Sequence, residues 1–145
     1  MQHRCGFLIS QIKNLTSRLL DETLEQHGMN AFSGAQGRIL DILWQQDQIP
    51  IREISRQTSL TMPTLTGMLD RMENAGLIKR APDPADRRKI NIRLTEEARS
   101  MEAGYRRVSD DMNTVFFKGF SEEEEAALQG YLERILNNLE AGSKE

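Results

Sequence analysis

Three consecutive cationic residues, Arg87, Arg88 and Lys89, follow a short proline-containing segment at residues 82–86. Guanidinium and ammonium groups clustered in this way bind phosphate, both through charge and through charge-assisted hydrogen bonds. The side chains with the most evident chemistry therefore predict binding to a polyanion.

The sequence offers no comparable arrangement for catalysis or for metal binding. His3 and His27 lie in unrelated places, no glycine-rich phosphate loop is present, and no nucleophile has an evident base. Cys5 is the single cysteine, so no disulfide can form within one chain, and His3 with Cys5 would supply only two metal ligands. We therefore expect no enzyme, no metal site and no cofactor.

Charge is unevenly distributed along the 145 residues. Residues 50–94 hold nine Lys or Arg against five acids, a net charge of +4, and the net charge of −3 for the whole chain leaves −7 for the remainder. A basic segment within an acidic frame directs one face of the molecule toward a polyanion. Charge alone also fits an ordinary solvated surface.

A helix over residues 62–75 is predicted next to this basic segment. Thr61 can cap its start, Pro63 is tolerated in its first turn, and Gly76 ends it. Leu65, Met68, Leu69 and Met72 share the side that we expect to be buried. The opposite side carries short side chains and one guanidinium, and it consists of Pro63, Thr64, Gly67 and Arg71.

Flanking elements complete a winged helix-turn-helix. A short helix begins at Pro50 and ends near Thr58, after a connection at residues 47–49. Residues 90–94 alternate apolar and polar side chains and pair with residues 77–81, so the cations lie on the loop of a β-hairpin. Such a fold binds duplex DNA, because a helix fits the major groove while the hairpin, the wing, reaches a neighbouring groove. The helix-turn-helix covers about 51–75 and the wing about 77–94, within a lobe at 33–94.

Amphipathic helices are predicted at both chain ends. One covers residues 7–26 and ends at Gly28, and a capping box at Ser33 and Gln36 starts the next helix. A long helix begins at Thr95, and a second capping box at 121–124 starts the last one. Because the lobe can close its core without these faces, we expect residues 1–28 and 95–145 of this single domain to form a homodimer, although they could instead cover their own core. The expected dimer contacts are Leu8, Ile12, Leu15, Val108, Met112, Val115, Leu128, Leu132, Ile135, Leu136 and Leu139.

Three motifs resemble the MarR family of bacterial transcriptional regulators. They are LDRMENAGLIKR at 69–80, DPADRR at 83–88 and LTEEA at 94–98, and the flanking helices follow the order of the family. The resemblance implies a mainly α fold with a small β-hairpin wing. It also implies a homodimer that binds a palindromic operator, usually as a repressor, and that often releases DNA on binding a small phenolic or aromatic-acid effector.

The resemblance also implies roles for single residues. Arg88 corresponds to the wing-tip arginine that enters the minor groove, and Asp86 is placed to hold its guanidinium. The leading part of the family's recognition helix, where short polar groups contact bases or phosphates, corresponds to Thr61, Thr64 and Thr66, with Pro63 and Gly67 permitting close approach. Arg71, one turn further on, would contact phosphate, whereas Thr66 could instead make a local backbone hydrogen bond. Asp70 is expected to pair with a neighbouring arginine, because its charge repels phosphate.

Two other interpretations stay open. A cysteine in the first helix senses peroxide in one branch of the family, and Cys5 lies slightly off that position. A winged helix could also serve as a protein-interaction module without DNA binding. The apolar run at residues 7–9 is too short for a signal peptide or a membrane span, so we expect a cytoplasmic protein.

Overall fold

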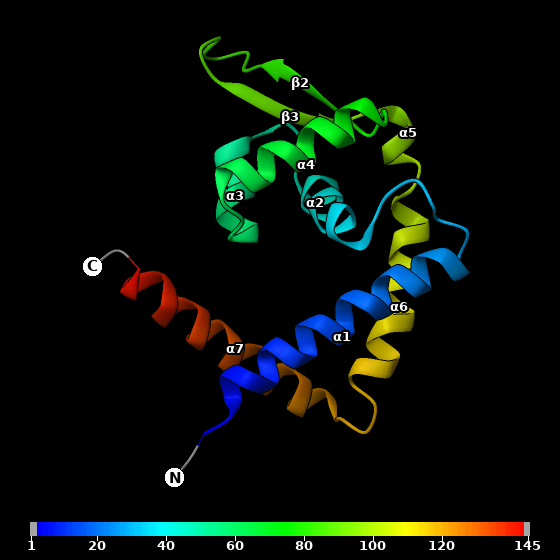
Figure 1. Ribbon diagram of the computed structural model, residues 1–145, viewed down its shortest axis with the longest axis vertical. Helices are drawn as coiled ribbons and strands as arrows, with labels where there is room; N and C mark the ends of the chain where they lie inside the picture. The colour runs from blue at the N-terminus through cyan, green and yellow to red at the C-terminus, as the bar shows by residue number, and fades with distance from the viewer. Residues whose placement is uncertain (1–2, 144–145) are drawn as a thin grey trace. The chain divides into compact units, whose positions relative to one another are not determined.

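The computed structural model describes residues 3–143 and shows a mostly helical chain with one small sheet (Figure 1). The chain divides into two compact units, one up to Asp110 and one from Asp111 onward. The predicted mainly α fold with a β-hairpin is confirmed. In chain order the elements are α1 (Cys5–Gln26), α2 (Gly34–Gln45), β1 (Ile49–Pro50), α3 (Ile51–Thr58), α4 (Met62–Asn74), β2 (Ile78–Pro82), β3 (Ile90–Leu94), α5 (Glu96–Arg99), α6 (Glu102–Phe116) and α7 (Glu122–Gly142).

Side-chain capping fixes the start of α2. Ser33 Oγ accepts a hydrogen bond from the Gln36 amide at 3.2 Å, and Gln36 Oε1 accepts one from the Ser33 amide at 3.1 Å. The predicted capping box is therefore present. Asp21 Oδ1 of α1 accepts a further hydrogen bond from the Gly34 amide at 2.7 Å, which joins the start of α2 to the preceding helix.

A three-stranded antiparallel sheet of order β1-β3-β2 forms the base of the hairpin. Residues 47–49, expected as a connection, partly belong to β1, in which Ile49 pairs with Ile92 and Pro50 with Asn91. Pro50 fits this edge strand because an edge position does not require its missing amide hydrogen. The strand expected at 77–81 is shifted by one residue, since the Leu77 amide donates to the Met72 carbonyl at the end of α4.

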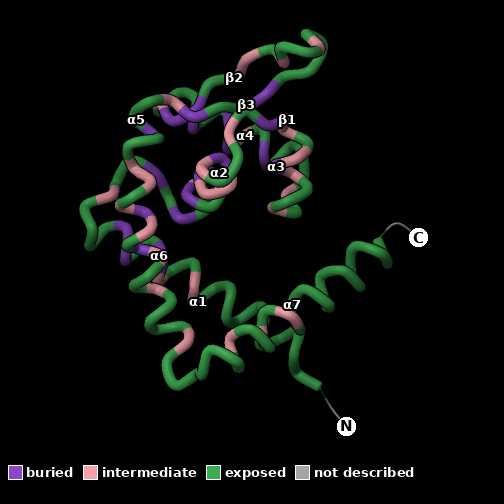
Figure 2. The backbone as a smooth tube through the Cα atoms, turned by 180° about the vertical axis from the view of Figure 1, so that it is seen from behind, coloured by how far each residue is buried: buried purple, intermediate pink, exposed green. Residues whose placement is uncertain are grey.

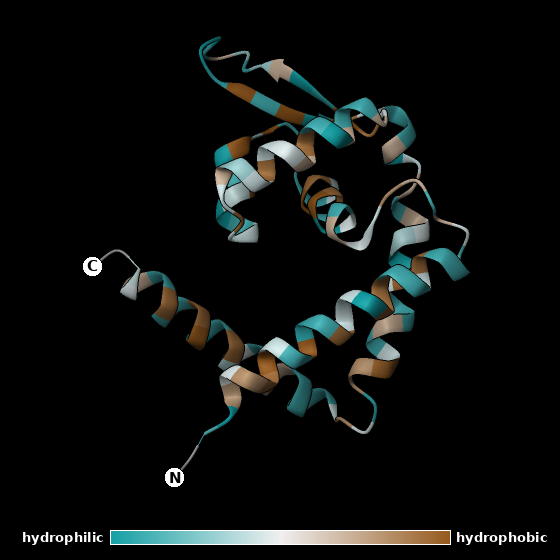
Figure 3. Cartoon of the chain, in the orientation of Figure 1, coloured by the Kyte–Doolittle hydropathy of each residue, from teal (hydrophilic) through white to brown (hydrophobic). Residues whose placement is uncertain are grey.

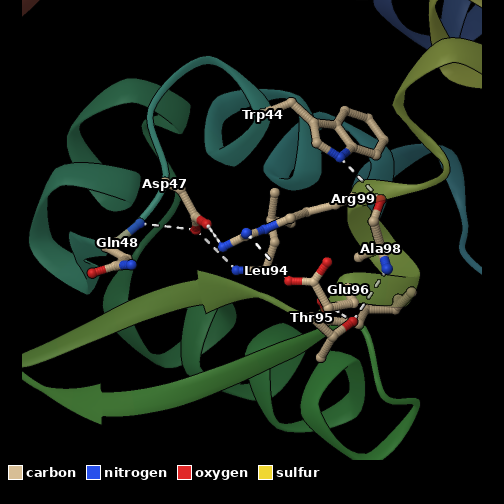
Figure 4. A network of polar contacts seen from close by, with 9 residues as sticks. Trp44, Asp47, Gln48, Leu94, Thr95, Glu96, Ala98 and Arg99 are labelled. Carbon is tan, nitrogen blue, oxygen red and sulfur yellow. Dashed lines mark hydrogen bonds and ion pairs between the residues drawn. The ribbon is translucent and has the colours of Figure 1, made fainter.

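Asp47 joins the sheet to α5 (Figure 4). Its Oδ1 accepts hydrogen bonds from the amides of Gln48 and Leu94, both at 2.9 Å, and its Oδ2 accepts one from Arg99 at 2.6 Å. Nearby, Trp44 Nε1 donates to the carbonyl oxygen of Ala98 at 3.1 Å. These contacts fix the end of β3 and the helix that follows it against α2.

The hydrophobic core lies in the first unit, where α2, α3 and α4 pack with the sheet (Figure 2). The four side chains predicted on the inner face of α4 are all buried. Ile39, Leu40 and Leu43 of α2 and Ile54 of α3 have no exposed surface. The spacing in the sequence thus identified the face of α4 that holds it in place.

The segment after Thr95 differs from the single long helix that was expected. α5 begins after Thr95, whose Oγ1 accepts a hydrogen bond from the Ala98 amide, and ends at Arg99. The Met101 amide then donates to the Ala98 carbonyl, a tighter turn than that of an α-helix, and α6 starts at Glu102. Tyr105 then packs in an aromatic cluster with Trp44 and Phe32, with ring centroids 5.1 and 6.2 Å away.

Val108 was expected in the dimer seam, but its side chain has no exposed surface within its own chain. It therefore offers nothing to a second copy. Its spacing from Tyr105 is the same whether a helix faces its own core or another chain, so the sequence could not distinguish the two. Val108 is corrected to a core residue of the first unit.

Exposed apolar residues recur along α7 and along the first half of α1 (Figure 3). No residue of α7 is buried, although Ser121 and Glu124 form the predicted capping box at its start. In α1, burial is confined to Leu20, Thr23 and Leu24. Within residues 3–143, none of the helices is both long and apolar enough to cross a membrane.

Candidate nucleic-acid interface

The α4 helix presents the polar face that the sequence predicted. Pro63, Thr64, Thr66 and Arg71 are exposed, and Gly67 is half-buried. Thr61 stands at the cap position but its side chain does not cap the helix; instead its Oγ1 donates to Thr64 Oγ1 at 3.1 Å. The expected capping bond of Thr61 is therefore wrong, although its exposed place at the start of α4 agrees with the prediction.

A tight turn sets α4 against α3. Ser59 adopts a left-handed conformation with φ of +57°, and Ser55 Oγ donates to the Leu60 carbonyl at 2.8 Å. Thr58 Oγ1 accepts a hydrogen bond from the Leu60 amide at 3.2 Å and donates to the Ile54 carbonyl at 2.8 Å. Side chains of α3 therefore satisfy the backbone of the turn and fix where α4 begins.

The wing loop is ordered by hydrogen bonds of its own. The amide of Asp83 donates to the Lys89 carbonyl at 2.8 Å, and the amide of Lys89 donates to the Asp86 carbonyl at 2.9 Å. Asp83 Oδ1 also accepts a hydrogen bond from the Ala85 amide at 2.8 Å. The loop that carries Arg87, Arg88 and Lys89 is consequently a defined structure that exposes all three cations.

Asp86 holds the Arg88 side chain, as expected. Arg88 Nε donates to Asp86 Oδ1 at 3.1 Å and Arg88 Nη2 to Oδ2 at 3.2 Å, while the Arg88 side chain stays 90% exposed. The Arg88 side chain, and then its backbone amide, lower the pKa of the Asp86 carboxyl below its usual value. Asp86 therefore stays ionised and orients a guanidinium that is open to a further anion.

Arg80 connects the wing to α4, a role that was not predicted for it. Its Nη1 donates to Glu73 Oε1 and its Nη2 to Asp70 Oδ1, both at 2.8 Å. The expected pairing of Asp70 with a neighbouring arginine is thus present, with Arg80 as the partner. A signal did exist, since two acids three residues apart on the exposed side of a helix face the strand that follows.

Glu53 of α3 is held in a similar way on the neighbouring helix. Its carboxylate accepts hydrogen bonds from Arg56 Nε and Gln57 Nε2, both at 3.0 Å. These bonds, chiefly that of Arg56, lower the pKa of Glu53 to about 2. The carboxylate thereby partly neutralises a guanidinium near the turn that leads into α4.

Comparisons with known proteins agree with this geometry. A family model described as MarR family matches residues 32–90. The Multiple antibiotic resistance protein MarR of Escherichia coli is 29% identical over 132 residues, which is 90% of each chain. A crystal structure of a mutant MarR from E. coli complexed with operator DNA superposes with a TM-score of 0.79 at 28% identity, covering 90% of this chain and 92% of that one. The chain belongs to the MarR family.

A second relative is the HTH-type transcriptional repressor IacR of Pseudomonas putida, which is 32% identical over 103 residues. The match covers 71% of this chain and 62% of IacR. MarR membership confirms the predicted winged helix-turn-helix and the predicted class, a DNA-binding transcriptional regulator. The individual contact residues on α4 and on the wing stay predictions.

A cavity of about 540 Å³ lies among α1, α2, α3 and α4 of this MarR-family chain. Lys13 and Arg38 line it together with Asp41 and Asp21. Asp41 pairs with Arg106 at 2.8 Å, and Asp21 accepts the Gly34 amide, so both carboxylates are engaged. Because residues 3–143 provide no ion pair for Lys13 or Arg38, the cavity combines two available cations with apolar walls.

Two remaining sequence candidates lie at the start of the chain. Cys5 is exposed and has a free thiol. Across residues 3–143, no three or more His, Cys, Asp or Glu side chains gather so that they could hold a metal ion. Redox sensing through Cys5 stays an untested interpretation.

Proposed function

We propose that this MarR-family regulator binds a palindromic operator as a homodimer and represses transcription there. The single observation that carries the proposal is the pairing of Arg88 with Asp86 at the wing tip, because it leaves an oriented guanidinium 90% exposed. The ordered wing loop also exposes the charges of Arg87 and Lys89. Since the operator belongs to chromosomal DNA, the site of action is the cytoplasm, and the role requires no catalysis.

Each part of the interface has a distinct task in this proposal. α4 enters the major groove with Thr61, Thr64 and Thr66 toward the bases, and Arg71 contacts phosphate. Arg88 enters the minor groove, where a guanidinium responds to groove width and potential more than to base identity. Pro63 and Gly67 allow the backbone of α4 to approach the DNA closely.

Homodimer formation is supported by the exposed apolar faces of α1 and α7. Leu8, Ile12 and Leu15 are 51%, 46% and 55% exposed, and Leu139 is 65% exposed. Large side chains repeated along a helix in this way are usually covered by a partner. A two-fold dimer would place its two α4 helices about 34 Å apart, one turn of B-DNA, to match a palindrome.

The cavity suggests how binding is regulated. A small aromatic or phenolic acid would place its ring on apolar walls such as Leu20 and Met68 and its carboxylate near Lys13 and Arg38. An effector changes DNA affinity only if it prefers one spacing of the two α4 helices over another. We therefore propose that an aromatic acid releases the operator by favouring a spacing that does not match one DNA turn.

A titration of selected genomic fragments over a range of salt concentrations tests the function. Purified protein should retain a small set of fragments, and the logarithm of its affinity should fall linearly with the logarithm of salt concentration. Addition of aromatic acids should then release the fragment. Absence of retained DNA at low salt would contradict the proposal and would favour a protein-interaction module.

A further inference from the structure

Met62 is an apolar side chain left exposed at the start of α4. It is 42% exposed, whereas Met68 and Met72 of the same helix are 8% and 0% exposed. The position directly follows Thr61 at the cap, in the turn that the proposed function places in the major groove. Its apolar surface is therefore available to whatever this turn contacts.

The other side chains of the same turn supply few hydrogen-bond donors. The hydroxyls of Thr61 and Thr64 are hydrogen-bonded to each other at 3.1 Å, which leaves only one of their two protons for an acceptor outside the chain. Pro63 has no donor. Bidentate contacts to guanine or adenine require Arg, Lys, Asn or Gln, and residues 61–67 contain none of them.

The nearest guanidinium on α4 lies further along the helix. A Cβ built on Gly67 would lie 3.7 Å from Arg71 Nη1, so the Arg71 side chain extends beside Gly67. Arg71 thus places a positive charge after the first turn of α4, where it suits a contact with phosphate. It does not supply a base contact in place of Met62.

Apolar contact in the major groove distinguishes one base in particular. Thymine alone carries a methyl group there, at C5, and apolar groups of side chains contact it. We infer that Met62 is a specificity-determining residue that packs against thymine methyl groups of the operator. This inference rests on the proposed function and adds the chemical basis of its sequence preference.

Replacing thymine with uracil tests the inference, because it removes only the C5 methyl group. The probe is the duplex that the wild-type protein enriches from a random-sequence pool, with the thymines of each half-site replaced one at a time. At one or two positions per half-site we expect affinity to fall about four-fold, the effect of losing one buried carbon group. The variant Met62→Ala should bind the thymine and uracil duplexes equally, because the two changes remove the same contact.

Ile90→Ala is the matched control, because Ile90 is an apolar residue with 44% exposure at the start of β3. Ile90 belongs to the wing, which the proposed function places in the minor groove, and thymine presents its methyl group only in the major groove. The Ile90→Ala variant should therefore retain the difference in affinity between the thymine and uracil duplexes. Equal binding of both duplexes by the wild type, or an undiminished difference in Met62→Ala, would overturn the inference and leave the proposed function intact. Failure to enrich any duplex would overturn both.

Discussion

Arg80 of β2 binds Glu73 of α4 at two points. Its Nη1 donates to Glu73 Oε1 at 2.8 Å, and its backbone amide donates to Oε2 at 3.2 Å. The same guanidinium reaches Asp70, so the strand leading into the wing is joined to the second half of α4. The two elements proposed to contact DNA are thus held together before DNA binds, which lowers the ordering cost of binding.

Replacing Arg80 with Met should affect DNA binding more than stability. The ion pairs are solvent-accessible, with Asp70 60% exposed, so we expect the free energy of unfolding to fall by less than about 1 kcal/mol. Operator affinity should fall about ten-fold, because the wing and α4 must then be ordered on binding. Thermal unfolding and fluorescence anisotropy measure the two effects. Lys79→Met, which removes a neighbouring exposed charge of the same strand, is the control, and equal losses in the two variants would show that Arg80 acts through charge alone.

Replacing Arg88 with Ala should lower operator affinity and reduce the slope of log affinity against log salt by about one unit. Asp86→Asn should also weaken binding, because Arg88 is no longer held, but it should leave the slope unreduced since no cation is lost. Titrations at four or more salt concentrations measure both quantities. Unchanged binding by Arg88→Ala would remove this residue from the DNA contacts.

The Glu53 pKa predicts a pH dependence of stability. Because the pKa falls from 4.5 to about 2 on folding, the stabilising contribution is fully present above about pH 4.5 and is lost as the pH falls toward 2. The difference in unfolding midpoint between wild type and Glu53→Gln should therefore be constant above pH 5 and shrink below pH 4.5. A difference that stays constant down to pH 3 would show that Arg56 does not hold the ionised carboxylate.

Charges introduced on α7 should dissociate the proposed dimer. Leu132 and Leu136 are 43% and 47% exposed, so Leu132→Glu with Leu136→Glu should leave the chain folded. Light scattering should then give the mass of one chain, and operator binding should be lost. By contrast Val108→Ala should cost about 2 kcal/mol of stability, because it opens a cavity in the core, without altering the mass. An intact dimer in the doubly charged variant would exclude this face of α7 from the interface.

Features that leave a pattern within a few neighbouring residues are the ones that the sequence could predict. The buried face of α4, the capping boxes at Ser33 and Ser121 and the strand at 90–94 each have a local signature within a few residues. The cations of the wing loop were identifiable because they are consecutive. Their exposure follows from the polar hairpin that carries them.

Contacts made through space explain what the sequence could not predict. β1 is only two residues long, too short to show an alternating pattern, and it exists because Ile49 and Pro50 pair with β3. Arg80 meets Asp70 and Glu73 only because the chain reverses at Gly76, where φ is +78°. Val108 shares the helical spacing of an interface residue, yet it packs in its own core.

The most direct test of the central claim is a hydroxyl-radical footprint of the selected duplex combined with sedimentation of the complex. The account predicts two protein chains per duplex and two protected regions centred about one helical turn apart, each flanked by minor-groove protection that disappears in Arg88→Ala. A complex with a single chain and one protected region, or no protection at any salt concentration, would contradict it.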